Sequence, residues 1–136
     1  MSLLSAQKFA ALLDSNNYDE ASKMMAEDCE YHYWEGSYRG QDNIISIYRQ
    51  HHIESKKLFD EITYTSQVEE MPNGNLKISL LDKIRKGGRW HELRSYQIIT
   101  FQDNLIVHIE HCEIPGEMES FRMFYRSAVS EESNLP

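Results

Sequence analysis

The chain has 136 residues, which is enough for one domain with one hydrophobic core. Its net charge of −8 argues against a nucleic-acid partner, because phosphates would be repelled. No apolar run approaches the length of a membrane span, and the first residues lack the features of a secretory signal. Cys29 and Cys112 are too few for a disulfide framework. We therefore expect a cytoplasmic protein with no membrane partner and no nucleic-acid partner.

The first half of the sequence has the periodicity of helices. Ile44, Ile47, Tyr48 and His51, for example, recur at the spacing of one helix face. A short aromatic stretch separates the helical segments and suits a strand. In chain order we predict a helix ending at Asp14, a short helix from Tyr18 that includes Met24 and Met25, a strand over Glu30–Trp34, a loop over Gly36–Gly40 and a helix from Gln41.

The second half alternates in the manner of strands and contains strong turn signals at Asn73-Gly74 and Gly87-Gly88. Helices followed by a strand meander indicate an α+β domain, which we place at residues 1–126. In chain order we predict strands over Phe59–Glu69, Leu76–Lys86, Arg89–Phe101 and Leu105–Ile114, then a helix over Glu117–Tyr125 and a flexible tail over residues 127–136.

The two-glycine loop also predicts the register of the hairpin around it, by counting outward from the loop. On one face, Arg85 is predicted opposite Trp90, which puts a cation beside an aromatic ring, and Lys83 opposite Glu92, which forms an opposite-charge pair. Both pairs support this register. The pairs predicted on the other face are Lys86 with Arg89, Ile84 with His91, Asp82 with Leu93, Leu80 with Ser95 and Ile78 with Gln97.

Asp82 and His91 interrupt an otherwise apolar face near the end of this hairpin. A carboxyl group on such a face is expected to have a raised pKa, and beside an imidazole it could act as a general acid or base. Alternatively, Asp82 lies near an open rim and is solvated. The last strand leaves a similar choice open, because either its His108 face or its His111 face could point inward.

The six histidines show no spacing typical of a metal site. His51 and His52 point in different directions on a helix, and His108 and His111 fall on opposite faces of a strand. Neither a glycine-rich phosphate loop nor a Gly-x-Ser-x-Gly motif is present. We therefore expect no metal and no cofactor.

A recognisable pattern is formed by Phe9–Asp14, Tyr18–Ala21, Met25–Tyr31, and Tyr38–Gly40 followed by Ile44–Gln50. It resembles the opening of SnoaL-like and ketosteroid-isomerase-like proteins, a branch of the nuclear transport factor 2-like superfamily. The resemblance implies a cone-shaped, curved antiparallel sheet with about three N-terminal helices enclosing one pocket. It also implies dimers that form through the outer face of the sheet.

The resemblance further implies which residues face the pocket. The positions that carry steroid isomerisation correspond to Phe9, Tyr33 and Gln97 here, and each departs from the isomerase pattern, so we do not expect that reaction by that mechanism. The alignment also selects the His111 face of the last strand as the inner one. The implied lining is Tyr31, Tyr33, Ile78, Leu80, Asp82, His91, Gln97, Ile109, His111 and Glu113.

This lining leads to two hypotheses of different classes. The first is a ligand-binding domain that acts as an isomerase, cyclase or dehydratase on an apolar carbonyl compound. In it Asp82 or His111 moves a proton, while Tyr33 and Gln97 hold the developing oxyanion. The alternative is a non-catalytic, dimeric domain for ligand binding or protein interaction. Either way, the dimer contact is predicted on the outer stripe of Trp90, Arg94, Tyr96 and Ile98.

Overall fold

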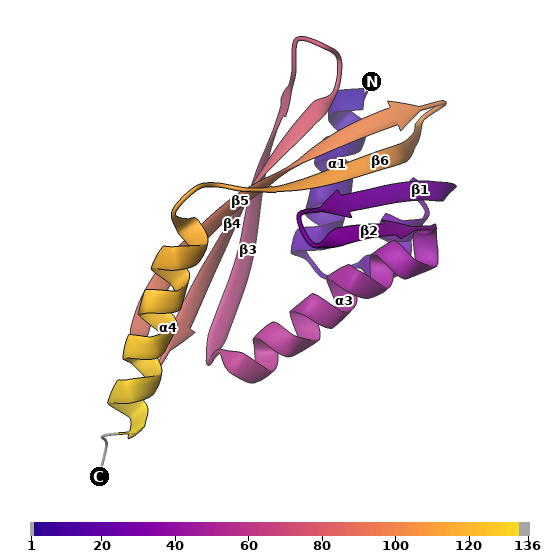
Figure 1. Cartoon of the computed structure of the whole chain (residues 1–136). Helices are drawn as coiled ribbons and strands as arrows, with labels where there is room; N and C mark the ends of the chain where they lie inside the picture. The colour runs from indigo at the N-terminus through magenta and orange to yellow at the C-terminus, as the bar shows by residue number, and fades with distance from the viewer. Residues whose placement is uncertain (1, 134–136) are drawn as a thin grey trace.

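The computed structural model describes residues 2–133, and within them the chain forms four helices and a six-stranded sheet (Figure 1). None of these helices is both long enough and apolar enough to cross a membrane. The helices are α1 (Ser2–Asp14), α2 (Tyr18–Ser22), α3 (Gln41–Leu58) and α4 (Glu117–Ser133). The strands are β1 (Met25–Tyr33), β2 (Gly36–Arg39), β3 (Glu61–Glu70), β4 (Leu76–Lys86), β5 (Arg89–Gln102) and β6 (Leu105–Glu113).

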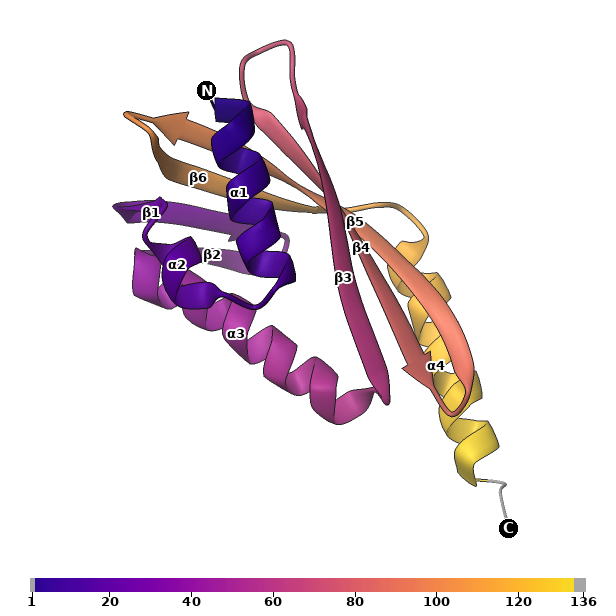
Figure 2. The same ribbon diagram turned by 180° about the vertical axis from the view of Figure 1, so that it is seen from behind.

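The sheet has the order β2-β1-β6-β5-β4-β3 and is strongly bent and twisted (Figures 1 and 2). Helices α1, α2 and α3 gather on one side of it, whereas α4 lies at its far end (Figures 1 and 2). The predicted α+β class with three N-terminal helices is therefore confirmed. The sheet is mixed rather than wholly antiparallel, because β1 joins β6 in parallel. This junction unites the two halves of the sequence, since β2, α3 and β3–β5 intervene between the two strands.

The hairpin of β4 and β5 has the register that was predicted from its turn. Lys86 pairs with Arg89 across the loop, and Asp82 pairs with Leu93 further along. Gly87 and Gly88 have φ values of 60° and 81°, a left-handed geometry that glycine adopts without steric cost. The Arg85 guanidinium also lies over the ring of Trp90, at 5.9 Å.

Several predicted boundaries are wrong. Helix α2 ends at Ser22, so Met24 and Met25, which were predicted to belong to it, lie outside it. Strand β1 begins at Met25, not near Glu30, because Met25 is fully buried and pairs with Ile106 of β6. Residues 36–39 form strand β2 instead of a loop, since they pair antiparallel with the end of β1. Helix α4 continues past Tyr125 to Ser133, so the predicted flexible tail is helical as far as that residue. Ala128, which is 1% exposed, extends the buried side of α4 beyond the predicted end.

The main hydrophobic core lies between helices α1–α3 and the inner face of the sheet. Phe9 on α1, Ile44 on α3 and Ile99 on β5 are fully buried in it. A smaller cluster joins α4 to the end of the β4–β5 hairpin through Phe59, Ile84, Phe124 and Ala128. The inner face of the sheet is thus covered in two places by different helices.

Candidate functional site

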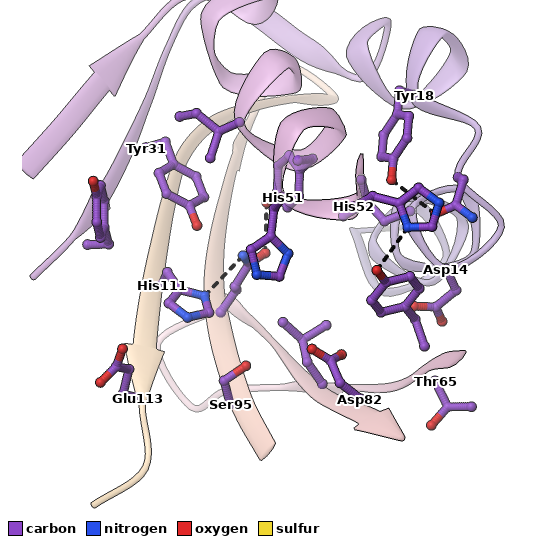
Figure 3. A pocket seen from close by; sticks show the side chains of 18 of the residues that line it. Asp14, Tyr18, Tyr31, His51, His52, Thr65, Asp82, Ser95, His111 and Glu113 are labelled. Atoms are coloured by element: carbon purple, nitrogen blue, oxygen red, sulfur yellow. Dashed lines mark hydrogen bonds between the residues drawn. The ribbon is translucent and has the colours of Figure 1, made fainter. Parts of the chain in front are cut away.

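A cavity of about 350 Å³ opens between the N-terminal helices and the inner face of the sheet (Figure 3). This volume lies at the lower end of the range typical of small-molecule sites. Its walls come from α1, α2 and α3, from β1, and from the meander of β3–β6. The predicted residues that line it are Tyr31, Tyr33, Leu80, Asp82, Gln97, His111 and Glu113.

Three residues predicted to line the pocket lie elsewhere. Ile78 and Ile109 do share the inner face, but both are fully buried in the core and are absent from the cavity wall. His91 lies under α4, where its ring stacks on Phe124 with centroids 4.9 Å apart. Helix α4 thus covers the end of the inner face that carries His91, and His91 is separated from the cavity. The predicted partnership of Asp82 with His91 is therefore not formed within the cavity.

Gln97 organises one end of the cavity. Its side chain is 2% exposed, and its Oε1 accepts a hydrogen bond of 2.9 Å from the Tyr48 hydroxyl. This contact orients the amide, so that its Nε2 lies 3.3 Å from Nδ1 of His111 (Figure 3). Because an amide nitrogen can only donate, Nδ1 of His111 must accept, and the imidazole proton resides on Nε2. His111 is thereby held as a neutral imidazole with its Nε2–H available to a ligand.

The surroundings of His111 also favour its neutral form. Burial lowers the pKa of His111, and the nearby His51 lowers it further, while Glu113 opposes this effect. His51 reaches the same end of the cavity from α3 (Figure 3), and burial likewise lowers its pKa. This region therefore presents two neutral imidazoles at physiological pH.

The other end of the cavity carries two carboxyl groups. Burial raises the pKa of Asp82 to about 7, and the neighbouring Asp14 raises it as well. Asp14 comes from the end of α1 and accepts a 2.6 Å hydrogen bond from the hydroxyl of Ser66. Burial also raises the pKa of Asp14, although the Ser66 hydrogen bond opposes this shift. Asp82 can thus exchange a proton near neutral pH, but its neighbouring ionisable group is the carboxyl group of Asp14 and not an imidazole.

Asp82 and His111 stand at different ends of the cavity. Gln97 is paired with Ile78 on β4 and with His111 on β6, so His111 lies two strands from β4. The four-residue rise from Ile78 to Asp82 adds to that separation, and together they place the two positions roughly 16 Å apart along the sheet. Asp82 and His111 can therefore contact different parts of a single elongated molecule.

Aromatic side chains gather at the part of the cavity wall that β1 supplies, next to β2. The Tyr33 and Tyr38 rings stack at 5.8 Å, and their hydroxyls are 3.2 Å apart. The exposed Trp34 donates a 2.9 Å hydrogen bond from Nε1 to the Glu113 carboxylate. The parallel register that pairs His32 with Glu110 puts Tyr33 beside His111 on the inner face.

Sequence reasoning missed several polar residues of the cavity. His51 was recognised only as part of a helical stripe, although its place on the buried face of that helix was a usable signal. Asp14 was interpreted only as a helix stop. His52, whose Nδ1 lies 2.9 Å from the Tyr64 hydroxyl, belongs to an adjacent wall that no local pattern indicated.

Among the described residues, one group of side chains has the composition and proximity of a metal site. Glu30, His32 and His108 place their ligand atoms within 4.8 Å of one another, outside the cavity. The expectation of no metal was based on spacing within single segments. This group instead forms across the parallel junction of β1 and β6.

No protein-family model matches the sequence, and no curated protein sequence matches it. Solved structures do match the fold over nearly the whole chain. The crystal structure of TerC with polyporic acid has a TM-score of 0.66 at 11% identity, covering 90% of this chain and 95% of that one. A candidate polyketide cyclase from Xanthomonas campestris pv. campestris has a TM-score of 0.67 at 11% identity, covering 89% and 93%. An epoxide hydrolase-like protein of M. tuberculosis has a TM-score of 0.67 at 10% identity, covering 96% and 95%.

These similarities establish the fold of the chain. Matching structures also include a nuclear transport factor 2-like protein and a candidate ketosteroid isomerase, so the fold implied by the sequence resemblance is confirmed. At such low identity the shared fold does not carry an activity, because the same scaffold accommodates different site residues.

Proposed function

We propose that this protein binds a small, elongated carbonyl compound in its cavity and catalyses a proton transfer on it, as an isomerase, cyclase or dehydratase. The observation that carries the proposal is the convergence of a proton donor and a proton carrier on one cavity of about 350 Å³. The structures with the same fold include one crystallised with polyporic acid and one candidate polyketide cyclase, which supports a small organic ligand.

His111 is proposed to hold the carbonyl oxygen. Its Nε2–H is the free donor left by the hydrogen bond from Gln97 to Nδ1, and a neutral imidazole can polarise a carbonyl. Tyr33, which neighbours His111 in the strand register, supplies its hydroxyl as a second hydrogen-bond donor. Gln97 itself is engaged with Tyr48 and His111, so we assign it as a positioning residue instead of an oxyanion donor.

Asp82 is proposed to carry the proton. A group is most effective as a general acid or base when its pKa lies near the working pH, and burial brings the pKa of Asp82 to about 7. Since Asp82 and His111 contact different ends of the ligand, the proton that moves is remote from the oxygen that is held. This arrangement suits a flat, conjugated molecule, through which charge at the carbon near Asp82 is delocalised to the oxygen near His111.

Exchange of carbon-bound protons for deuterium tests this chemistry without knowledge of the natural substrate. The protein is incubated in D₂O with a panel of flat cyclic enones and hydroxyketones, and deuterium incorporation is followed by NMR. We expect exchange with the wild type, and a loss of about 100-fold or more in Asp82→Asn, which is the usual contribution of a general acid or base. His111→Gln should weaken both binding and exchange.

The matched control for this experiment is Asp103→Asn. Asp103 lies in the exposed β5–β6 turn with a φ of 53°, a conformation that asparagine tolerates. This variant should exchange protons at the wild-type rate. Full exchange activity in Asp82→Asn would contradict the assigned role, and ligand binding without any exchange in the wild type would favour the non-catalytic alternative.

We also propose a homodimer formed through the outer face of β5. Trp90, at 55% exposed, is a large apolar side chain beside Arg94, Tyr96 and Ile98 on that face. Sedimentation analysis should show a dimer for the wild type and a shift to monomer in a Trp90→Ala, Tyr96→Ala variant. A wild-type monomer at micromolar concentration would refute the interface. The cytoplasmic location stays a prediction from the sequence.

A further inference from the structure

A cluster of two imidazoles and a carboxylate lies on the opposite face of the sheet from the cavity. Tyr31 and Tyr33 of β1 line the cavity, so the alternate residues Glu30 and His32 point to the outer face. Strand β6 runs parallel to β1 beside them, with Glu30 paired to His108 (the strands marked in Figure 1). Residues far apart in the sequence are thereby brought together at the junction between the two halves of the sheet.

We propose that Glu30, His32 and His108 bind one Zn²⁺ ion. Two histidines and one carboxylate are a ligand set that zinc accepts, with water completing a tetrahedral shell. The side chains of His32 and Glu30 are 41% and 45% exposed, so an ion and its water can reach them from solvent. The site is independent of the cavity and of the chemistry proposed there.

The distances within the cluster suit a chelate. Nε2 of His32 lies 3.3 Å from Oε2 of Glu30. Two ligands at the usual zinc distances, separated by a tetrahedral angle, are about 3.3 Å apart. The ligand atom of His108 is within 4.8 Å of the other two, so a side-chain rotation is enough to bring it into the shell. The imidazoles of His32 and His108 stack, with centroids 4.7 Å apart and an interplanar angle of 25°, so binding requires one ring to turn until both nitrogen lone pairs point at the ion.

The surrounding charges also favour a cation at this position. Glu110 is paired with His32 in the register of β1 and β6 and adds a carboxylate to the same face. Arg39 competes for Glu30, but its guanidinium approaches Oε1, at 4.0 Å, and leaves Oε2 directed at His32. Arg39 also lies 3.9 Å from Asp28, so it is shared between two carboxylates. Arg39 can therefore remain at Oε1 and orient Glu30 while Oε2 binds the ion.

Calorimetric titration of the full chain with ZnCl₂, after treatment with a chelator and at neutral pH, tests the proposal. We expect one Zn²⁺ per chain in the wild type. His32→Ala, His108→Ala and Glu30→Gln should each weaken binding at least tenfold. All three side chains are partly exposed, so the folds should survive, which circular dichroism verifies. Co²⁺ in place of Zn²⁺ should give the intense visible absorption of a tetrahedral centre in the wild type and in none of these three variants.

The pocket histidines supply the matched control, since they could also attract an ion. His51→Ala and His111→Gln should bind Zn²⁺ with the wild-type stoichiometry and affinity. Loss of binding in these variants, with retention in His32→Ala, would place the ion in the cavity and overturn the proposal. Absence of stoichiometric binding to the wild type would overturn it as well.

Discussion

Replacing Asp82 with asparagine should make the stability of the protein less sensitive to pH. Burial and the nearby Asp14 raise the pKa of Asp82 from 3.8 to about 7 in the folded protein. Because the folded state then holds this proton more tightly than the unfolded state, Asp82 favours folding at low pH. That contribution is complete below about pH 3.8 and is lost as the pH rises through about 7. Asparagine has a similar shape and no charge to desolvate.

The size of this change in stability follows from the pKa shift of Asp82. Each pH unit between the two pKa values changes the free energy of unfolding by about 1.4 kcal/mol. A change from about pH 5 to about pH 8 includes roughly two pH units that lie below the folded-state pKa of Asp82. The stability of Asp82→Asn relative to the wild type should therefore increase by about 2 to 3 kcal/mol over this range. Urea denaturation of both proteins at these two pH values measures the difference directly.

The exposed Asp103→Asn variant is the control, and its stability relative to the wild type should change by less than about 0.5 kcal/mol over the same range. If Asp82→Asn changes stability equally at both pH values, the ionised carboxylate is not desolvated in the folded state. That result would refute both the raised pKa and the assignment of Asp82 as the proton carrier.

Other regions of the molecule give further predictions. Gln97→Leu should destabilise the fold by about 1 to 3 kcal/mol, because it leaves the buried Tyr48 hydroxyl without its acceptor. It should also raise the pKa of His111 in an NMR titration, since a donor that opposes protonation of Nδ1 is removed; an unchanged titration would contradict the assigned tautomer. Phe124→Ala should cost about 3 to 5 kcal/mol in urea denaturation and speed amide exchange in α4, whereas retained protection would show that α4 does not depend on this ring. Gly88→Ala should cost about 1 kcal/mol, because its φ of 81° strains an L side chain although space is open around it; no loss in thermal denaturation would refute the turn geometry.

Local patterns were sufficient wherever the interactions are local. The β4–β5 hairpin could be predicted residue by residue, because a two-glycine loop leaves one register and the side-chain period of two then assigns the faces. The same alternation put Asp82 and Gln97 on the inner face, but it left open whether Asp82 is buried with a raised pKa or solvated at a rim, and the burial of Asp82 in the folded chain raises its pKa.

Contacts between distant segments were decided by tertiary structure. Alternation could not show that α4 covers His91, because a strand pattern contains no information about which helix packs on it. It could not show that His51 faces His111, or that β1 pairs in parallel with β6 and so assembles Glu30, His32 and His108.

The sequence by itself determined the α+β class, the presence of the helices and the inner position of Asp82, since backbone propensity and periodicity act over a few residues. Only the tertiary structure decided the content of the cavity. The imidazoles of His51 and His111 and the carboxyl groups of Asp14 and Asp82 come from α1, α3, β4 and β6, whose approach depends on the bend of the sheet and the packing of the helices against it. The pKa values of these groups depend in turn on that burial and proximity, and so the chemistry of the cavity arises from the fold.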